Sequence, residues 1–380
     1  MAEQLRGKYV IAGVGHTAYG DLGGRSTLSM NVEACRAALE DAAVDKDAVD
    51  AVLVKAPTSK FEMMYGQKVA ERLGLHPNVG GVLDQAGASP ISLIAYATMA
   101  IEAGQCEVAL VTFADNPRSG TRNAYAHPLG PYGPYGWFGT SAGYAMIARR
   151  HMEEYGTTSE QLGAIAVACR AHGAANPAAQ LQKPITIADH QASRWIVEPL
   201  HRDDCALVSD GGAAVVVMSA ERSRALGVRD AVPILGFGQG HTSWEVQQRP
   251  SLTTTAARHS AETAFAMAGI RPNQVDVTQL YDCFTITVLM SIEDYGFCAP
   301  GSGGAFVAEP GALEVGGALP LNTSGGLLSE TGMPGMQLVL EGVRQIRGGS
   351  TTQVPGARTC VVSNQGGIMH THSTLIVGRQ

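Results

Sequence analysis

The sequence predicts an α/β fold built from two similar halves that share one core. Three observations predict it: strand-like and helix-like segments alternate, an internal repeat is present, and the composition allows a large core. The chain has 380 residues, of which 45% are hydrophobic and 16% charged, so disorder is excluded as its general state. This length suggests about two or three domains, and we expect an N-terminal half over 1–230 and a C-terminal half over 231–380.

The first half begins with a strand–helix–strand pattern. KYVIAGVG (8–15) is a β-branched run that ends in glycine, and apolar residues then recur at helical spacing from Leu28 to Leu39. The next strand is DAVLVKA (50–56). This order is typical of a buried, largely parallel sheet.

The same pattern returns in the second half. EACRAALEDAAVDKDAVD (33–50) aligns without a gap with the segment that ends at 276, and each is preceded by a glycine-ended strand, VPILGFGQG (232–240) in the second half. A second repeat pairs the helix–strand segment 100–115 with 343–367. Two matches in the same order favour duplication over chance.

Residues 116–200 differ from both repeats and predict a loop insert in the first half. Two helix-like stretches, 141–156 and 159–177, follow the Gly/Pro/aromatic stretch 128–139, which predicts no regular element. Four aromatic residues lie at the end of this stretch: Tyr132, Tyr135, Trp137 and Phe138. They suit either the wall of a pocket for a bulky hydrophobic group or an interface, and the sequence leaves both open.

Charge, cysteine usage and hydropathy exclude several classes of protein. Lys and Arg total 27 against 34 Asp and Glu, with no basic cluster, so we expect no nucleic-acid partner. The seven cysteines form no C-x-x-C pair, which fits neither a disulfide framework nor a zinc site and indicates a reducing compartment. No signal peptide or apolar run of the ~18 residues needed for a membrane span is recognisable, so we expect a soluble, cytoplasmic protein with no membrane partner.

Polar residues at the tip of a strand in the second half mark the first candidate site. The strand-like run 275–280 is followed directly by Tyr281, Asp282 and Cys283 and then by an apolar helical run. Ligands bind at such strand tips because loop side chains and helix N–H groups converge there. The structural alternative is that Asp282 caps the helix while Tyr281 and Cys283 pack in the core.

A second candidate is the turn in LPLNTSGG (319–326). Asn322, Gly325 and Gly326 form a polar turn there, and adjacent glycines allow a ligand or a helix to approach the backbone closely.

The third candidate is SNQGGIMHTH (363–372), in which SNQGG, with the pair Gly366 and Gly367, separates two strand-like runs. His370 and His372 stand two apart, so on a strand both imidazoles would face the same side. No cysteine or carboxylate ligand lies nearby, which favours structural histidines over a metal site. We therefore expect no metal.

Together these motifs resemble the thiolase superfamily, in its sterol-carrier-protein-type branch. The resemblance rests on YDCFT (281–285), NTSGGLLSE (322–330), SDGGAAVVVMSAE (209–221), the helix–strand pair within 100–115, and the duplicated halves. It covers nearly the whole chain. It implies two βαβαβαββ-type halves in a five-layered arrangement, a loop domain that contacts coenzyme A, and a homodimer.

The chain departs from that family at its catalytic positions. The nucleophilic cysteine is matched by Gly87, the G-H-P histidine by Gly332 or Met333, and the C-terminal cysteine by Asn364. An acyl-cysteine intermediate needs a nucleophile with an adjacent base, and the usual pair is missing.

The family's H-D-C-F histidine has become Tyr281, although Cys283 is kept. This change resembles the steroid side-chain aldolase subgroup, whose members act with a small zinc-ribbon plus OB-fold partner. The resemblance implies retro-aldol cleavage of a 3-hydroxyacyl-CoA. That reaction needs a base, an oxyanion site and a proton source, but no nucleophile.

We accordingly assign Tyr281 to proton transfer, and Asn322 with the N–H groups near Gly325 and Gly326 to the thioester oxygen. Tyrosine has a pKa near ~10, so a basic Tyr281 needs a cationic or hydrogen-bonding neighbour. Either histidine of the third candidate could supply it, or be the base itself.

The glycine pairs at 325–326 and 366–367 are the expected contacts to coenzyme A, which enters as part of the substrate with no tightly bound cofactor. Two alternatives stay open: a thiolase-type acyltransferase that uses Cys283, and a non-catalytic CoA-binding subunit.

Overall fold

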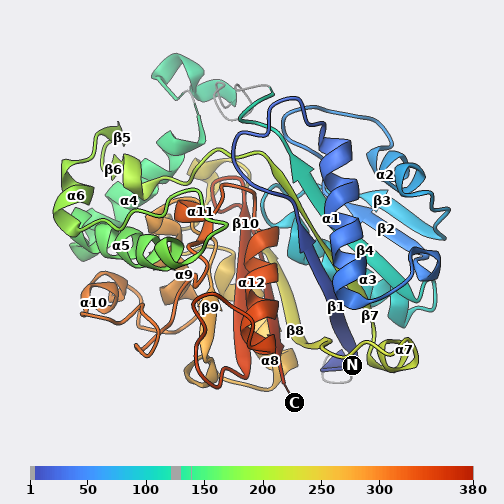
Figure 1. The fold of residues 1–380 in the computed structure, drawn as a ribbon. Helices are drawn as coiled ribbons and strands as arrows, with labels where there is room; N and C mark the ends of the chain where they lie inside the picture. The colour runs from blue at the N-terminus through green and yellow to red at the C-terminus, as the bar shows by residue number, and fades with distance from the viewer. Residues whose placement is uncertain (1–4, 121–129, 138, 380) are drawn as a thin grey trace.

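The computed structural model describes residues 5–120, 130–137 and 139–379, and these contain a nine-stranded mixed sheet (Figure 1). Its strand order is β3-β2-β4-β7-β1-β8-β11-β10-β9. The strands are β1 (Tyr9–His16), β2 (Ala51–Val54), β3 (Val79–Val82), β4 (Val108–Asp115), β7 (Gly211–Ser219), β8 (Val232–His241), β9 (Val277–Gln279), β10 (Thr359–Gly366) and β11 (Thr371–Gly378). The first five in the spatial order come from the N-terminal half and the last four from the C-terminal half.

The two halves meet where β1 pairs antiparallel with β8, through Val10 opposite Pro233 and Ile11 opposite Val232. Within the first half, β2 pairs parallel with both β3 and β4, and β7 is antiparallel to β4 and β1. Within the second, β9 is parallel to β10, and β11 is antiparallel to β10 and β8.

Helices and strands form five layers. The helices outside the insert are α1 (Thr27–Ala42), α2 (Tyr65–Leu73), α3 (Ser89–Glu102), α7 (Ala220–Ala225), α8 (Ala257–Ala268), α9 (Thr285–Asp294), α10 (Gly303–Ala308), α11 (Gly326–Ser329) and α12 (Met336–Arg347). Helices α3 and α12 contact each other and strands of both halves, so they form the central layer.

The strand pattern explains this layering. In β2, Ala51 and Leu53 belong to the central core, whereas Val52 and Val54 pack in the core under α1 and α2. A third core lies under α8 and α9 on the outer side of the C-terminal half. Because strands are buried on both faces, they read as continuous apolar runs. The expected five-layered α/β arrangement is confirmed.

The segment between β4 and β7 contains η3 (Gly130–Tyr135), α4 (Thr140–Tyr155), α5 (Ser159–Ala175), α6 (Ile187–Ala192) and the hairpin β5 (Trp195–Val197) and β6 (Leu200–His201). Helices α4, α5 and α6 lie together at one side of the molecule in Figure 1, in shades of green. Both helices expected there form within two residues of the expected bounds. The stretch expected to be irregular contains the short 3-10 helix η3, and Phe138 lies outside the described residues.

The expected break at SNQGG is wrong in its position. Strand β10 continues through Asn364 as far as Gly366, and only 367–370 forms the turn. Two polar side chains of this buried strand bond to the neighbouring backbone: Ser363 Oγ accepts from the N–H of Tyr281, and Asn364 Nδ2 donates to the Gly87 carbonyl. None of the described helices is both long and apolar enough to cross a membrane.

Candidate active site

A cavity of about 470 Å³ lies where the segments after β2 and β9, the start of α3, the end of β10 and the first turn of α4 converge. We call it the reaction cavity. Tyr281, Cys283, Gly366 and Gly367 all line it. These four predicted site residues, which come from two separate segments of sequence, are therefore brought together.

Tyr281 occupies the position that the resemblance assigns to the nucleophile. Gly87 lines the cavity just before α3, and a Cβ built on it would lie 2.2 Å from Tyr281 Oη and 2.3 Å from the Gln365 carbonyl oxygen. A cysteine side chain at position 87 and the Tyr281 hydroxyl therefore compete for one space. The loss of the thiol and the gain of the tyrosine are sterically coupled.

The other positions that match the family's catalytic residues offer no base. Met333 is fully buried, and Gly332 packs so that a Cβ on it would lie 1.6 Å from the Leu207 carbonyl oxygen. Asn364 is buried with its amide donating to Gly87 at 3.0 Å. An asparagine amide does not ionise at neutral pH and so cannot serve as a general base; its hydrogen bond holds the start of α3 against β10.

Cys283 lines the cavity, but its thiol is poorly suited to nucleophilic attack. Its Sγ accepts a hydrogen bond from Gln365 Nε2 at 2.9 Å, and burial raises its pKa to about 12. The same Gln365 amide donates to Tyr144 Oη at 2.8 Å. A thiol with this pKa is protonated at neutral pH, whereas the thiolate is the nucleophile.

Asn322, Gly325 and Gly326 do not line the cavity. Asn322 Oδ1 accepts from the N–H of Leu280 at 2.7 Å and its Nδ2 donates to the Leu280 carbonyl at 2.8 Å, so the amide holds the tip of β9. A Cβ on Gly326 would lie 2.2 Å from an Asp282 carboxylate oxygen, and one on Gly325 would lie 2.7 Å from the backbone of α5. The turn needs glycine for packing, so the predicted role of these residues at the thioester oxygen has no support in their placement.

Asp282 explains why this turn closes on the strand tip. Its buried carboxylate accepts from the N–H groups of Leu327 and Leu328 at 2.8 and 3.2 Å, and burial raises its pKa to about 6. It therefore caps α11, not the helix that follows it in sequence.

The two histidines of the third candidate have different surroundings. His370 lies in the turn before β11, where its ring is 5.2 Å from that of Trp244, and burial lowers its pKa. His372 lies on β11, where its Nε2 is hydrogen-bonded to Tyr295 Oη at 2.9 Å. Burial lowers the pKa of His372 to about 3. Neither lines the cavity, and His370 lies in the turn, so the two histidines do not share the strand that the expectation assumed.

The sequence-based reasoning missed Lys55, which lines the reaction cavity directly after β2. Its side chain is only 2% exposed. The signal was present in DAVLVKA, where a charged residue directly follows an apolar strand, as Tyr281 follows β9.

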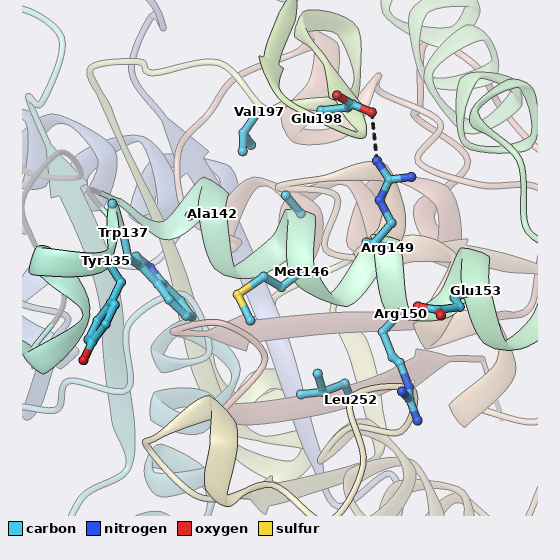
Figure 2. Close-up of a pocket in the computed structure, with 12 residues that line it drawn as sticks. Tyr135, Trp137, Ala142, Met146, Arg149, Arg150, Glu153, Val197, Glu198 and Leu252 are labelled. Atoms are coloured by element: carbon cyan, nitrogen blue, oxygen red, sulfur yellow. Dashed lines mark hydrogen bonds and ion pairs between the residues drawn. The ribbon is translucent and has the colours of Figure 1, made fainter.

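A second pocket, of about 490 Å³, lies beside α4 (Figure 2). The helix presents Thr140 and Tyr144 to the reaction cavity and Met146 and Arg149 to this second pocket. Arg149 pairs with Glu198 across the pocket at 2.9 Å. The two spaces thus share one helix as a wall.

Of the four aromatic residues proposed as a ligand wall, Tyr135 and Trp137 line this second pocket. Tyr132 packs on Trp137 with the ring centroids 5.0 Å apart. None of these three lines the reaction cavity.

Residues 238–379 match the family model described as Thiolase C-terminal domain-like. A steroid side-chain-cleaving aldolase from Thermomonospora curvata is 38% identical, with 98% of both chains covered. The 17-hydroxy-3-oxo-4-pregnene-20-carboxyl-CoA lyase of Mycobacterium tuberculosis is 36% identical over 96% of this chain and 98% of that one. The solved structure of the Ltp2-ChsH2(DUF35) aldolase has a TM-score of 0.89 at 37% identity, with 98% of both chains covered. The chain therefore belongs to the thiolase superfamily, in its aldolase branch.

Proposed function

We propose that this protein cleaves the C2–C3 bond of a 3-hydroxyacyl-CoA by a retro-aldol reaction, in the degradation of a steroid-like side chain. The observation that carries the proposal is the Tyr281 hydroxyl, which fills the space that a side chain at Gly87 would need. A proton-transfer group thus stands where the superfamily's usual chemistry requires a thiol. The two full-length relatives named as a side-chain aldolase and a CoA-thioester lyase support the same reaction.

The reaction needs one group to take up and return a proton. Tyr281, as tyrosinate, removes the proton of the 3-hydroxyl, and the oxygen electrons form the C3 carbonyl while the C2–C3 bond breaks. The bond electrons pass to the thioester as an enolate, which takes a proton at C2 from the tyrosine hydroxyl. The products are a ketone and a shortened acyl-CoA, and the tyrosinate is regenerated. Gly366 and Gly367 line the cavity and are the glycines we assign to the CoA thioester.

An acyltransferase that uses Cys283 is the weaker alternative. Its thiol has a pKa of about 12 and is bonded to an uncharged amide, so no adjacent base activates it. A non-catalytic subunit is disfavoured by the relatives, whose names describe enzymes and whose chains match over their whole length.

We assign the nucleotide end of coenzyme A to the second pocket. Arg149 and Arg150 line it, and Trp137 offers an aromatic surface. The arginines form exposed ion pairs with Glu198 and Glu154, and such pairs contribute little, so phosphates can compete for them. The expected result of Arg149→Met with Arg150→Met is a higher KM for the CoA ester with an unchanged kcat, and an unchanged KM would contradict the assignment.

We propose a homodimer that pairs through β3. This strand is at the edge of the sheet, and large apolar side chains are exposed on it, on α3 and before α2. They are Phe61, Met63, Met64, Val82, Tyr96 and Met99. Light scattering should give twice the chain mass, and a monomer would contradict the proposal.

We also propose that the protein acts with a small zinc-ribbon plus OB-fold partner in the cytoplasm. The solved structure with a TM-score of 0.89 is named as an aldolase with a DUF35 protein, which supports a partner of that kind. Co-expression with a DUF35 protein from the same genome should give a stable complex on gel filtration, and separate elution would argue against it.

The deciding experiment compares Tyr281→Phe with Cys283→Ala, using release of the ketone from a 3-hydroxyacyl-CoA. Loss of a proton-transfer group costs about 10²–10⁴-fold in rate, so we expect that loss for Tyr281→Phe and an almost unchanged rate for Cys283→Ala. Tyr155→Phe, at a half-exposed tyrosine on α4, is the matched control. The opposite pattern, with an acyl group found on Cys283 by mass spectrometry, would replace the aldolase by the acyltransferase.

A further inference from the structure

Lys55 carries the one charged side chain among the described residues that line the reaction cavity. None of the other described residues that line it is an aspartate, glutamate, arginine, lysine or histidine. The charge of the cavity wall therefore comes from a single ammonium group. A mostly apolar cavity around one cation favours bound groups that carry negative charge.

The ammonium is buried without a counter-ion in contact. Lys55 Nζ donates to the Ala56 carbonyl at 2.9 Å, lies 3.5 Å from Thr58 Oγ1, and is 4.4 Å from the centroid of the Phe113 ring. None of the ion pairs within 4.0 Å between described residues includes Lys55. Lysine is almost never fully buried unless it is paired, because the charge loses its hydration.

The two acidic residues that act electrostatically on Lys55, Asp84 and Asp115, accept hydrogen bonds from other groups. Asp115 accepts from the N–H groups of Thr58, Ser59 and Asn116 at 2.7, 3.2 and 2.9 Å. Asp84 is exposed and accepts from the N–H of Ala86 at 2.9 Å. Burial lowers the pKa of Lys55, although Asp84 and Asp115 act in the opposite direction.

The start of α3 adds to the positive potential in the cavity. Ala86 and Gly87 line it immediately before this 14-residue helix, whose N-terminus carries partial positive charge. A lysine beside a helix N-terminus is unfavourable by itself, since both are positive. The arrangement becomes favourable when an anion lies between them.

Resting on the proposed function, we propose that Lys55 is a catalytic residue whose ammonium stabilises the enolate that forms when the C2–C3 bond breaks. The enolate is the negative species that this reaction creates, and it forms where Tyr281 meets the substrate. The cation is in place before the reaction, so no reorganisation is needed as the charge develops.

The size of the effect follows from Coulomb's law. For opposite charges about 6–8 Å apart at an effective dielectric constant of about 20, the attraction corresponds to a rate factor of about 30 to 100. Lys55→Met, which removes the charge and keeps most of the shape, should lower kcat by this factor with KM almost unchanged. Lys55→Arg keeps the charge and should recover most of the loss. Lys46→Met, at an exposed lysine on the surface, is the control with wild-type rates.

A second readout separates the enolate from the bond cleavage. Wild-type protein incubated with the shortened acyl-CoA product in D₂O should exchange the C2 proton, because this exchange forms the enolate without any C–C bond. Lys55→Met should slow the exchange by the same factor of about 30 to 100. A purely structural role would not lower both rates while leaving KM and the melting temperature unchanged. If Lys55→Met does not fold, Lys55→Gln provides the same neutral comparison.

Three results would overturn the proposal. Wild-type kcat and exchange in folded Lys55→Met would exclude a catalytic charge. A loss confined to substrates with a distal keto or carboxylate group would make Lys55 a specificity residue. A borohydride-dependent adduct of the ketone on Lys55 would make it a nucleophile. The proposed function can fail separately. It fails if the wild-type protein exchanges the C2 proton but cleaves no 3-hydroxyacyl-CoA, and the exchange assay then still tests Lys55. If the wild-type protein does neither, both proposals are overturned.

Discussion

Replacing Gly87 by alanine should abolish most of the activity while the fold survives. The new Cβ would lie 2.2 Å from Tyr281 Oη and 2.3 Å from the Gln365 carbonyl oxygen, whereas real Cβ atoms essentially never approach another heavy atom within 3.0 Å. The Gln365 carbonyl belongs to β10, where Gln365 is paired with His372 of β11, so it yields little. The Tyr281 ring must therefore move.

The magnitude follows from that displacement. Moving a reacting group by about 1 Å costs on the order of 10²-fold in rate, and overpacking a filled site costs about 1–3 kcal/mol of stability. We expect kcat/KM for ketone release to fall about 100-fold in Gly87→Ala, with a small decrease in melting temperature by circular dichroism. The activity loss thus exceeds what partial unfolding at the assay temperature can produce.

Gly349→Ala is the matched control, because a Cβ there meets no atom within 4 Å and its φ is not positive. It should keep wild-type activity. A folded Gly87→Ala protein whose kcat/KM stays within about threefold of wild type would refute the idea that the position of the Tyr281 hydroxyl controls the reaction.

Three further predictions concern groups that hold the site together. Burial lowers the pKa of His372 to about 3, so below pH ~6.5 the unfolded chain takes up a proton that the native state excludes. Between pH 7 and 5 the free energy of unfolding measured in urea should therefore fall by about 2 kcal/mol more for the wild-type protein than for His372→Gln. Equal decreases would contradict this. Asn322→Ala leaves both backbone groups of Leu280 without their partner and should lower the free energy of unfolding by about 2–4 kcal/mol, whereas unchanged stability would show that water replaces the amide. Asp282→Asn replaces one of the two oxygens that face the start of α11 by an N–H donor. The free energy of unfolding should fall by about 1–3 kcal/mol in the same assay, and an unchanged value would show that a single amide oxygen is enough for this turn.

The layers of the fold could be predicted because they depend on local patterns. Apolar runs of strand length, such as DAVLVKA, and helical spacing between Leu28 and Leu39 are visible over a few residues. The cluster of Tyr281 with Gly366 and Gly367 was also predictable in part, since all follow or end buried strands. Residues that follow the carboxyl ends of neighbouring parallel strands meet at the same edge of the sheet, even when they are far apart in the sequence.

The roles of Asn322 and the histidines could not be predicted, because they depend on partners distant in sequence. Asn322 is a polar residue in a glycine turn, and only the fold shows that its amide is consumed by Leu280, 42 positions earlier. His370 and His372 follow the two-residue period only if both are on the strand, and the longer β10 puts His370 in the turn. The position of Lys55 at the tip of a strand could be predicted from the sequence, but its burial could not.

The most direct test of the central claim is the product analysis of a 3-hydroxyacyl-CoA incubated with the protein and its partner in D₂O without free coenzyme A. The account predicts a ketone and a shortened acyl-CoA in equal amounts, with at least one deuterium at C2 of the acyl-CoA and no acyl group bound to the protein. Cleavage that requires added coenzyme A, or an acylated cysteine, would contradict it.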